Sequence, residues 1–352
     1  MIIEILGTRV IGPVFGVSLF VWSALLAVTL GALATGYFFG GVLVDRRPSP
    51  KTLNAAVALS GTALALAPVA RRSVLAATQA FGPRIGPLLS ALVLFGPALA
   101  ALGAVGPIAA RLMSTDVGFA GRRVGGIFAI STAGSLCGTF LVGYWLIPSF
   151  ETDHILIGVS GLLTLAGAIP WMLRGKRIAG AALCMPFLAY LAPSQSLPAG
   201  YELLDQVHSM YGKVQVIDDT TKKVRFLRVD HSVIGADLIP EYDTAFTFVY
   251  LLELVRVLRP AAGSMLQIGL GTGSLARSFQ RTSIKTDVVE LDPAVVTLAR
   301  KHFRFQPTGD VFEEDARTFI NRTKRRYDVI VHDTFTGGST PEHLLSREVF
   351  AR

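Results

Sequence analysis

Three glycines at alternate positions form the first candidate site in this sequence. Gly269, Gly271 and Gly273 directly follow the apolar segment 264–268, which has the length and composition of a buried strand. Glycine lacks a side chain, so the backbone of such a loop can approach a bound cofactor closely. Glycine-rich turns also open ordinary strand–helix units, so the motif is weak evidence when it stands alone.

Acidic residues follow each of the next three strands that the pattern predicts. Glu290 comes 17 positions after Gly273 at the end of a second strand, where a carboxylate suits the paired hydroxyls of a ribose. Asp315 follows a third strand and could accept a hydrogen bond from an adenine amino group. Asp333 ends a fourth strand. Acids at successive strand ends are typical of adenosyl recognition, so we expect a nucleoside-binding site.

A dinucleotide such as NAD is the competing ligand for this kind of loop. In residues 269–274, the third glycine of the GxGxxG pattern falls on Ser274. This departure, together with the two further acidic strand ends, favours a ligand of the S-adenosylmethionine type over a dinucleotide.

The elements that must position these residues alternate between strand and helix. Strands are expected at 264–268, 287–290, 310–312 and 328–332, with helices at 244–258, 274–280, 294–303 and 317–321. This order predicts a parallel, doubly wound sheet with its ligand beyond the carboxyl ends of the strands. The expected fold class is an α/β Rossmann-like domain, like that of S-adenosylmethionine-dependent methyltransferases, over residues 241–352.

A shorter β segment precedes this domain. Residues 211–218 and 222–230 alternate apolar and polar side chains around an Asp-Asp-Thr-Thr turn, which predicts a β-hairpin. We therefore expect a small β-hairpin domain over residues 206–240. The stretch 194–205 has Ser and Pro residues near its start and is expected to be a linker.

The first half of the chain has the composition of a membrane protein. The whole sequence is 51% hydrophobic and only 16% charged, whereas a soluble domain carries about a quarter charged residues. The apolar stretches long enough to cross a hydrocarbon core lie at 15–44, 53–70, 85–110, 124–147, 154–173 and 178–192. We expect an N-terminal α-helical transmembrane bundle over residues 1–193. The sixth stretch is short and contains Pro186, so the number of spans is five or six.

Basic loops predict how this bundle is oriented. Three loops with three Lys or Arg residues each lie at 45–51, 111–123 and 174–177. The positive-inside rule places such loops in the cytoplasm. Arg71, Arg72 and Arg84 then fall on the outer side as exceptions. We expect an integral membrane protein with a cytoplasmic C-terminal domain, which requires segment 178–192 to be interfacial or re-entrant, or an earlier boundary to be miscounted.

The charge pattern, the cysteines and the small residues indicate which binding partners to expect. All of the net charge of +8 falls in residues 1–193, in short clusters between apolar runs, so it does not indicate nucleic-acid binding. Cys137 and Cys184 lie inside apolar segments without the spacing of a metal site, and no metal is expected. Small residues within 31–40 and 134–138 predict closely packed helices. The lipid bilayer is the expected partner, and a homo-oligomer is permitted.

Several of these segments resemble the spermidine synthase (aminopropyltransferase) family. The similar motifs in the second half of the chain are 266–274, 288–293, 314–316 and 327–333. Ser209-Met-Tyr-Gly212 is similar to the Tyr-Gln motif of that family and its N-terminal β-domain. In the first half, 12–16 and 36–46 resemble the multi-span region of bacterial membrane-fused spermidine synthase-like proteins. The resemblance covers nearly the whole chain and implies a location in the bacterial inner membrane.

The resemblance implies transfer of an aminopropyl group from decarboxylated S-adenosylmethionine to a polyamine such as putrescine. Asp333 matches the catalytic aspartate of the family, which deprotonates the amine, and Tyr211 matches a tyrosine that orients it. Glu290 matches the acid that binds ribose. Asp315, followed by Ala316, matches the acid that binds adenine. Together with the three loop glycines, these last three residues are the expected cofactor-binding set.

Three positions depart from the family pattern and leave other functions open. Thr272 and Thr336 stand where the family carries aspartates, and Gly212 stands where it carries glutamine. The donor could then be ordinary S-adenosylmethionine, in a membrane-bound methyltransferase that acts on another small substrate. A catalytically inactive transporter or sensor with a degenerate nucleotide domain is a third possibility. The resembling fold continues for three more strands beyond Arg352, so we expect an incomplete sheet at the C-terminus.

Overall fold

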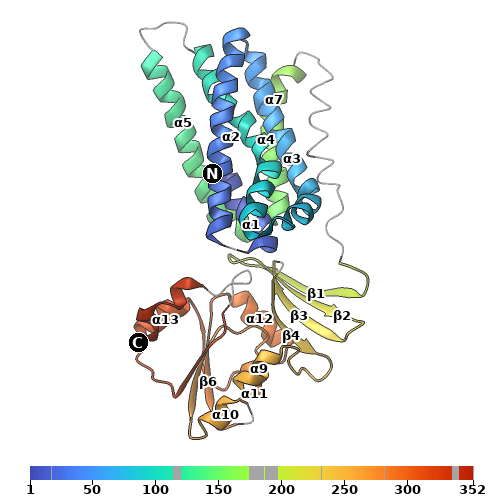
Figure 1. Cartoon of the computed structure of the whole chain (residues 1–352), viewed down its shortest axis with the longest axis vertical. Coiled ribbons are helices and arrows are strands. Elements are labelled where there is room, and N and C mark those ends of the chain that lie inside the picture. Colours follow the sequence, from blue (N-terminus) through green and yellow to red (C-terminus); the bar gives the residue numbers. More distant parts are fainter. Residues whose placement is uncertain are drawn as a thin grey trace. The chain divides into compact units, whose positions relative to one another are not determined.

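The computed structural model (Figure 1) describes residues 1–16, 18–113, 120–173, 186, 197–230, 232–280, 282–334 and 341–351. The chain folds into two compact units, Met1–Ser194 and Gln195–Arg352. The first unit is helical, and the second contains two sheets with their helices. Each unit has an apolar core of its own.

The helical unit contains five helices that are long and apolar enough to cross a membrane. They are α2 (Leu19–Arg46), α3 (Pro50–Gln79), α4 (Gly82–Met113), the continuous segment Gly121–Ser149 and α7 (Thr152–Met172). The fourth combines α5 (Ala120–Leu141), a π-helical turn (Val142–Leu146) and α6 (Ile147–Ser149). Five of the predicted apolar stretches are thus confirmed as long helices. The sixth, 178–192, lies outside the described residues except for Pro186.

The chain begins with a short helix. The sequence pattern does not separate this helix from the first span. α1 (Ile2–Phe15) has 14 residues, so it extends about 21 Å and falls short of a hydrocarbon core of about 30 Å. Gly16, with a φ of 77°, ends α1 before α2 begins. Leu6, Val10 and Ile11 bury one face of α1 in the core of the helical unit. The first long helix therefore begins at residue 19 and not at residue 15.

Glycines let two of the long helices approach closely. A Cβ atom on Gly36 of α2 would overlap the carbonyl oxygen of Ala100 in α4, and one on Gly40 would lie 2.6 Å from the Cα atom of Ala104. At Gly134 a Cβ atom would meet open space. The predicted small-residue packing is therefore used at 36–40 but not at Gly134.

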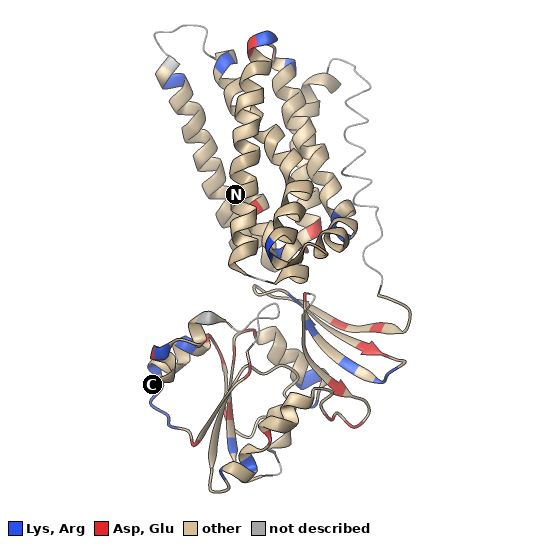
Figure 2. Ribbon diagram, in the orientation of Figure 1, with Lys and Arg blue, Asp and Glu red and all other residues tan. Residues whose placement is uncertain are grey.

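Charged residues of the helical unit gather at the ends of its long helices. Figure 2 shows Lys and Arg at these ends, with few along the helices. Arg111 of α4 pairs with Asp45 of α2 at 3.5 Å, and Arg71 Nη1, near the end of α3, lies 2.9 Å from Asp153 Oδ1 in the first turn of α7. The end of α3 and the start of α7 therefore lie at the same end of the bundle.

The predicted β-hairpin is the middle of a four-stranded antiparallel sheet. The strands are β1 (Tyr201–His208), β2 (Lys213–Asp219), β3 (Val224–Val229) and β4 (Ser232–Leu238), in that spatial order. The structure corrects the single hairpin because register shifts, after Leu203 in β1 and after Leu227 in the β3–β4 pairing, break the alternation that reveals a strand. β1 also begins inside the expected linker 194–205.

The second sheet is parallel, which confirms the prediction from strand–helix alternation. β5 (Ser264–Ile268), β6 (Lys285–Glu290), β7 (Val311–Glu313) and β8 (Val329–His332) pair in the order β7-β6-β5-β8. The helices of this unit are α9 (Thr247–Leu252), α10 (Val255–Leu258), α11 (Ser274–Ser278), α12 (Pro293–His302), α13 (Ala316–Arg322), a 3₁₀ turn (Glu342–Leu344) and α14 (Arg347–Phe350). The single helix expected at 244–258 is divided into α9 and α10.

Helices cover both faces of the parallel sheet. α11 and α12 pack with Met265 and Val288 on one face, and α13 packs with Leu266 and Val289 on the other. The helices that connect the strands therefore change from one face of the sheet to the other between β5 and β8. In open sheets of this kind the ligand site lies at the carboxyl edge beside that change.

Candidate functional site

The glycine loop joins β5 to α11 along a path that side chains disfavour. Gly269, Gly271 and Gly273 have φ values of 88°, 56° and 76°, in the left-handed region that favours glycine. A Cβ atom on Gly269 would overlap the carbonyl oxygen of Asp333. The three predicted glycines are therefore needed by the local backbone, and the first of them brings the loop against the end of β8.

Glu290 ends β6 and holds this loop. Its Oε2 accepts a hydrogen bond of 2.9 Å from the Leu270 amide, and its Oε1 accepts one of 3.0 Å from the Asp292 amide. Burial raises the pKa of the Glu290 carboxyl, although backbone amides that donate to it act in the opposite direction. A carboxylate offers about four lone-pair sites. The backbone amides do not fill all of these sites, so Glu290 can still accept a hydrogen bond from a ligand.

Asp333 follows β8 directly, on the other side of the loop. Because β5 lies between β6 and β8, Glu290 and Asp333 flank the glycine loop. The Asp333 amide donates to the Ile268 carbonyl oxygen at 2.9 Å, which ties the residue to the end of β5. Burial raises the pKa of the Asp333 carboxyl, and a carboxylate with a raised pKa is a stronger base. Thr336, three positions further on, lies outside the described residues.

Asp315 and Ala316 begin α13, after strand β7. Asp315 caps this helix, because its Oδ1 accepts hydrogen bonds from the Thr318 amide at 2.8 Å and from the Thr318 hydroxyl at 3.0 Å. Its Oδ2 lies 3.6 Å from His343 Nε2. Burial acts to raise the pKa of Asp315, but Thr318 and His343 outweigh it and leave that pKa below its ordinary value. The observed role of Asp315 is a helix cap, and its contact with adenine stays a prediction.

Tyr211 lies in the turn between β1 and β2, with its side chain 43% exposed. Ser209 organises this turn: its hydroxyl oxygen accepts a hydrogen bond from the Tyr211 amide at 3.1 Å, and the hydroxyl donates to Asp292 Oδ2 at 2.6 Å. Asp292 also caps α12 by accepting from the Ala294 amide at 2.9 Å. The turn that carries Tyr211 is thus tied to the residue two positions after Glu290, while the role of Tyr211 toward an amine stays a prediction.

Ser209 and Asp292 are site residues that the sequence reasoning missed. For Asp292 a signal was present, because an acid followed by proline after a strand is typical of a helix N-cap with proline at the first helical position. No local pattern points to the role of Ser209, because its hydrogen bond to Asp292 joins residues 83 positions apart.

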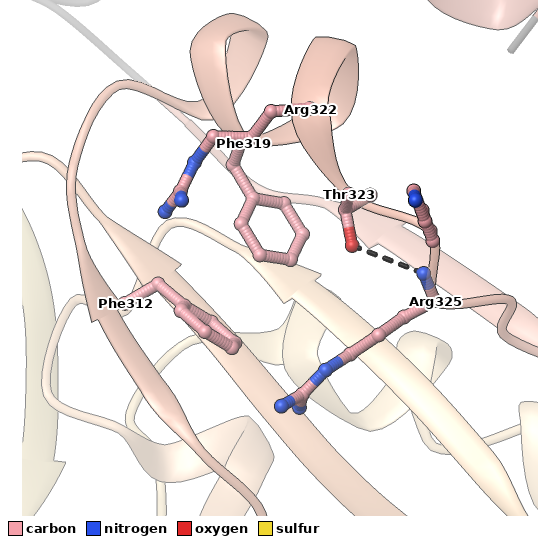
Figure 3. Close-up of a pocket in the computed structure, with 6 residues that line it drawn as sticks. Phe312, Phe319, Arg322, Thr323 and Arg325 are labelled. Atoms are coloured by element: carbon pink, nitrogen blue, oxygen red, sulfur yellow. Dashed lines mark hydrogen bonds between the residues drawn. The ribbon is translucent and has the colours of Figure 1, made fainter.

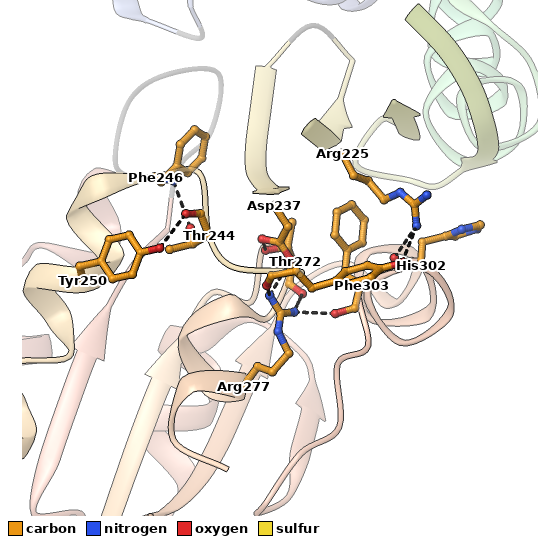
Figure 4. Close-up of polar contacts among 10 residues, drawn as sticks. Arg225, Asp237, Thr244, Phe246, Tyr250, Thr272, Arg277, His302 and Phe303 are labelled. Carbon is orange, nitrogen blue, oxygen red and sulfur yellow. Dashed lines mark hydrogen bonds and ion pairs between the residues drawn. The ribbon is translucent and has the colours of Figure 1, made fainter. Parts of the chain in front are cut away.

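Asp237 of β4 is a third missed residue, and no local pattern points to it. It is fully buried, with 0% of its surface exposed. The Thr272 hydroxyl in the glycine loop donates to Asp237 Oδ1 at 3.0 Å, and Arg277 Nη2 donates to Oδ2 at 2.6 Å (Figure 4). Burial raises the pKa of Asp237 to about 6, although Arg277 acts to lower it. An acid in a strand usually marks a solvent-facing position, so burial here is visible only in the fold.

A surface pocket of about 370 Å³ lies elsewhere in the same unit (Figure 3). Its lining is formed by Phe312, Phe319, Arg322, Thr323, Lys324 and Arg325. It adjoins the C-terminal end of α13, about 10 Å along that helix from the Asp315 cap. Arg325 in its wall is already paired with Asp287 and Asp310. The pocket is therefore separate from the carboxyl edge at which the predicted residues meet.

The chemistry at the carboxyl edge is that of carboxylates and backbone amides. Within the described ranges, no group of three or more His, Cys, Asp or Glu side chains could hold a metal ion. Glu290 can accept hydrogen bonds from hydroxyls, and Asp333 can accept a proton. The structure thus brings the glycine loop, Glu290 and Asp333 together and ties the Tyr211 turn to the same edge.

Sequence comparisons find relatives that match parts of the chain, and no protein-family model matches it. The chain is 33% identical over 171 residues to an N-terminal histidine N-methyltransferase of Emericella nidulans, which covers 42% of this chain and 31% of that protein. It is 36% identical over 110 residues to a polyamine aminopropyltransferase of Vibrio vulnificus, covering 29% of this chain and 37% of that protein. A polyamine aminopropyltransferase of Alkaliphilus metalliredigens is 26% identical over 167 residues, with 45% and 57% covered.

The chain spans between about a third and just over half of the length of these curated relatives. Among solved structures, a probable spermidine synthase from Corynebacterium glutamicum aligns with a TM-score of 0.35 and 20% identity, over 44% of this chain and 58% of that chain. The sequence similarities support a spermidine synthase-like domain within this chain.

Proposed function

We propose that the C-terminal unit binds an adenosyl sulfonium donor and transfers a carbon group from it to an amine nitrogen. The observation that carries this proposal is the placement of Glu290 and Asp333 on the two sides of a left-handed glycine loop. The similar proteins are named for aminopropyl transfer and for methyl transfer to a nitrogen. Transfer of an aminopropyl group from decarboxylated S-adenosylmethionine to a polyamine such as putrescine is the first candidate.

Three groups at the carboxyl edge would hold the donor: a carboxylate, the glycine loop and the start of α13. Glu290 would accept hydrogen bonds from the ribose hydroxyls through the lone pairs that the backbone amides leave open. Gly269 and its neighbours in the loop would let the backbone approach the donor closely. Asp315 and Ala316, at the start of α13, would bind the adenine. These assignments extend to this chain the roles that the family resemblance implies.

The reaction needs a base beside the amine. The nitrogen lone pair of the acceptor forms a bond to the carbon next to the sulfonium, the carbon–sulfur bond breaks, and its electron pair stays on sulfur in neutral methylthioadenosine. Asp333 takes the proton that the nitrogen loses, and burial gives its carboxyl the raised pKa that this role favours. Burial lowers the pKa of the adjacent His332, so that side chain stays neutral near pH 7 and does not repel a cationic polyamine. Tyr211 is the candidate for orienting the amine.

Methyl transfer from ordinary S-adenosylmethionine is the second candidate, and one observation favours it. Thr272 carries no charge, is 2% exposed and directs its hydroxyl to Asp237. The loop therefore presents no carboxylate of its own to the amino group of a donor, and it does not repel the carboxylate that ordinary S-adenosylmethionine retains. The same base would serve, since both reactions form a bond to nitrogen.

Calorimetric titration of the full chain in detergent with each donor tests the proposal. Tighter binding of decarboxylated S-adenosylmethionine supports aminopropyl transfer, and tighter binding of the ordinary form supports methyl transfer. Radiolabel transfer from the preferred donor to putrescine or another small amine then measures turnover. If neither donor binds, the proposal is refuted and an inactive membrane protein with a degenerate nucleotide domain remains.

We also propose that the helical unit anchors this activity in a bacterial inner membrane with the C-terminal unit in the cytoplasm. The five long apolar helices support the anchoring. The basic residues in the loops at 45–51 and 111–123 support the orientation.

A further inference from the structure

The antiparallel sheet packs directly against the glycine loop. A Cβ atom on Gly235 of β4 would lie 2.6 Å from Thr272 Cγ2, and one on Gly271 would lie 2.7 Å from the carbonyl oxygen of Ile234. These approaches leave no space for a ligand between β4 and the loop. One side of the loop is therefore closed by β4, and a donor must contact the other side.

Asp237 connects β4 to segments that are distant in the sequence. Its two oxygens accept hydrogen bonds from Thr272 in the loop and from Arg277 in α11, at 3.0 Å and 2.6 Å (Figure 4). The same guanidinium donates to the carbonyl oxygens of Tyr242 at 2.6 Å and Phe303 at 2.5 Å. The carboxylate has no exposed surface, so it cannot touch a ligand and can act on one only through its partners.

We propose that Asp237 is a positioning residue that sets the glycine loop for donor binding through Thr272 and Arg277. The inference rests on the proposed function, since it requires the loop to bind the donor. The ion pair with Arg277 neutralises the carboxylate inside the protein. Asp237 thus fixes the loop without contacting the donor. Position 272 itself carries the uncharged side chain of threonine.

Ionisation of Asp237 gives this role a pH signature. Burial raises the pKa of Asp237 to about 6 against the effect of Arg277, and the nearby Asp243 adds to the increase. As the pH falls through this range, Asp237 gains a proton and its ion pair with Arg277 is lost, so donor affinity should fall. Burial also raises the pKa values of Glu290 and Asp333 at the same edge. The role of Asp237 is therefore tested by the difference in the pH dependence of donor affinity between the wild type and a variant that lacks the Asp237 carboxylate.

The test measures donor affinity for D237N, T272V and the double variant of the full chain, by calorimetric titration with the donor that binds tighter to the wild type. At neutral pH T272V should bind about tenfold more weakly, the effect of losing one hydrogen bond to a charged group, and D237N should bind at least as weakly because it also loses the charge that pairs with Arg277. The double variant should bind about as weakly as D237N, because both changes break the same connection. The decline in affinity near pH 6 should also be smaller in D237N than in the wild type.

D287N is the matched control. Asp287 is also a buried acid paired with an arginine, since it lies 2.7 Å from Arg325, but it belongs to β6 three residues before Glu290 and away from the loop. D287N should keep wild-type donor affinity and pH dependence. Equal weakening by D287N and D237N would show general destabilisation and overturn the inference.

The remaining outcomes separate this inference from the proposed function. If D237N binds the donor like the wild type at every pH, the positioning role is overturned while the proposed function stands. If the wild type binds neither donor, the proposed function itself is overturned. Should D237N fail to fold, T272V carries the test, because it keeps the Asp237–Arg277 pair, and unchanged affinity in T272V would overturn the role.

Discussion

At the scale of single residues, the acids at the carboxyl edge differ in what surrounds them. Burial raises the pKa values of Glu290 and Asp333. Asp315 is held below its ordinary pKa because the hydrogen bonds from Thr318 and the contact with His343 outweigh burial. A carboxylate with a raised pKa suits proton transfer, whereas one held low suits a permanent helix cap. The surroundings therefore favour Asp333 over Asp315 as the base.

Asp333→Asn should lower the rate of group transfer by about 10²- to 10⁴-fold, which is the usual contribution of a general base. Donor binding should change little, since Glu290 and the glycine loop remain. Single-turnover assays with radiolabelled donor, run beside calorimetric titration, measure the two effects separately. A variant that loses donor affinity to the same extent as rate would show that Asp333 supports the loop and does not act on the amine.

The same carboxyl predicts the pH dependence of the rate. A base works only when ionised, so the rate should rise with pH through the pKa of Asp333, which burial places above its ordinary value of 3.8. The rise should be absent in D333N. The measurement is the single-turnover rate at a series of acidic to neutral pH values, with donor saturating at each. A wild-type rate that stays flat over this range would contradict the role of Asp333.

Sequence patterns identify the residues that end strands and miss those that connect the two sheets. Gly269, Glu290 and Asp333 follow apolar strands, and parallel strands place their carboxyl ends at one edge, so these residues could be grouped from the sequence. Asp237 and Ser209 act through partners 35 and 83 positions away. No local periodicity encodes such pairs. These hydrogen-bonded pairs form only when the antiparallel sheet packs on the parallel domain.

At the scale of elements, close approaches between backbones decide how both units pack. In the helical unit, Gly36 and Gly40 let α2 meet α4, and in the second unit Gly269 lets the loop meet the end of β8. The parallel strands could be predicted closely because each contains a short apolar run that alternates with a helical segment. β1 and β4 could not, because their register shifts remove the period of two.

Gly36→Ala should destabilise the helical unit by about 1–3 kcal/mol, the usual cost of overpacking. The reason is that its Cβ atom would overlap the Ala100 carbonyl oxygen. Gly41→Ala, in the same helix, meets open space and should be neutral or stabilising by up to about 1 kcal/mol. Thermal unfolding of the two variants in detergent provides the comparison. Equal Tm values would show that α2 and α4 do not pack through Gly36.

At the scale of the whole molecule, the two units differ in net charge. All of the net charge of +8 lies in residues 1–193, and its clusters are at the ends of the long helices (Figure 2). Arg71 is an exception to the positive-inside rule, because the basic loops place its end of the bundle on the outer side. The structure pairs it with Asp153, so it adds little net charge at its end of the bundle. The exception is therefore weaker than the sequence count indicates.

Reporter fusions should place both the loop at 47–49 and a junction after residue 200 in the cytoplasm, because the basic loops set the orientation. A fusion between α3 and α4, at residue 81, should report the outer side and serves as the control. Activity of the reporter at residue 200 only on the outer side would contradict the cytoplasmic placement of the C-terminal unit. The same result would favour a sixth crossing at 178–192.

The overlap that excludes a side chain at Gly269 involves residues 64 positions apart in the chain. A ribosome makes the glycine loop well before it makes β8, and such distant contacts form late in folding. The loop therefore reaches its final path only when Asp333 arrives and packs against it. If the loop binds the donor and Asp333 is the base, as proposed, the two are completed together, so a growing chain would not bind an adenosyl sulfonium before it could use one.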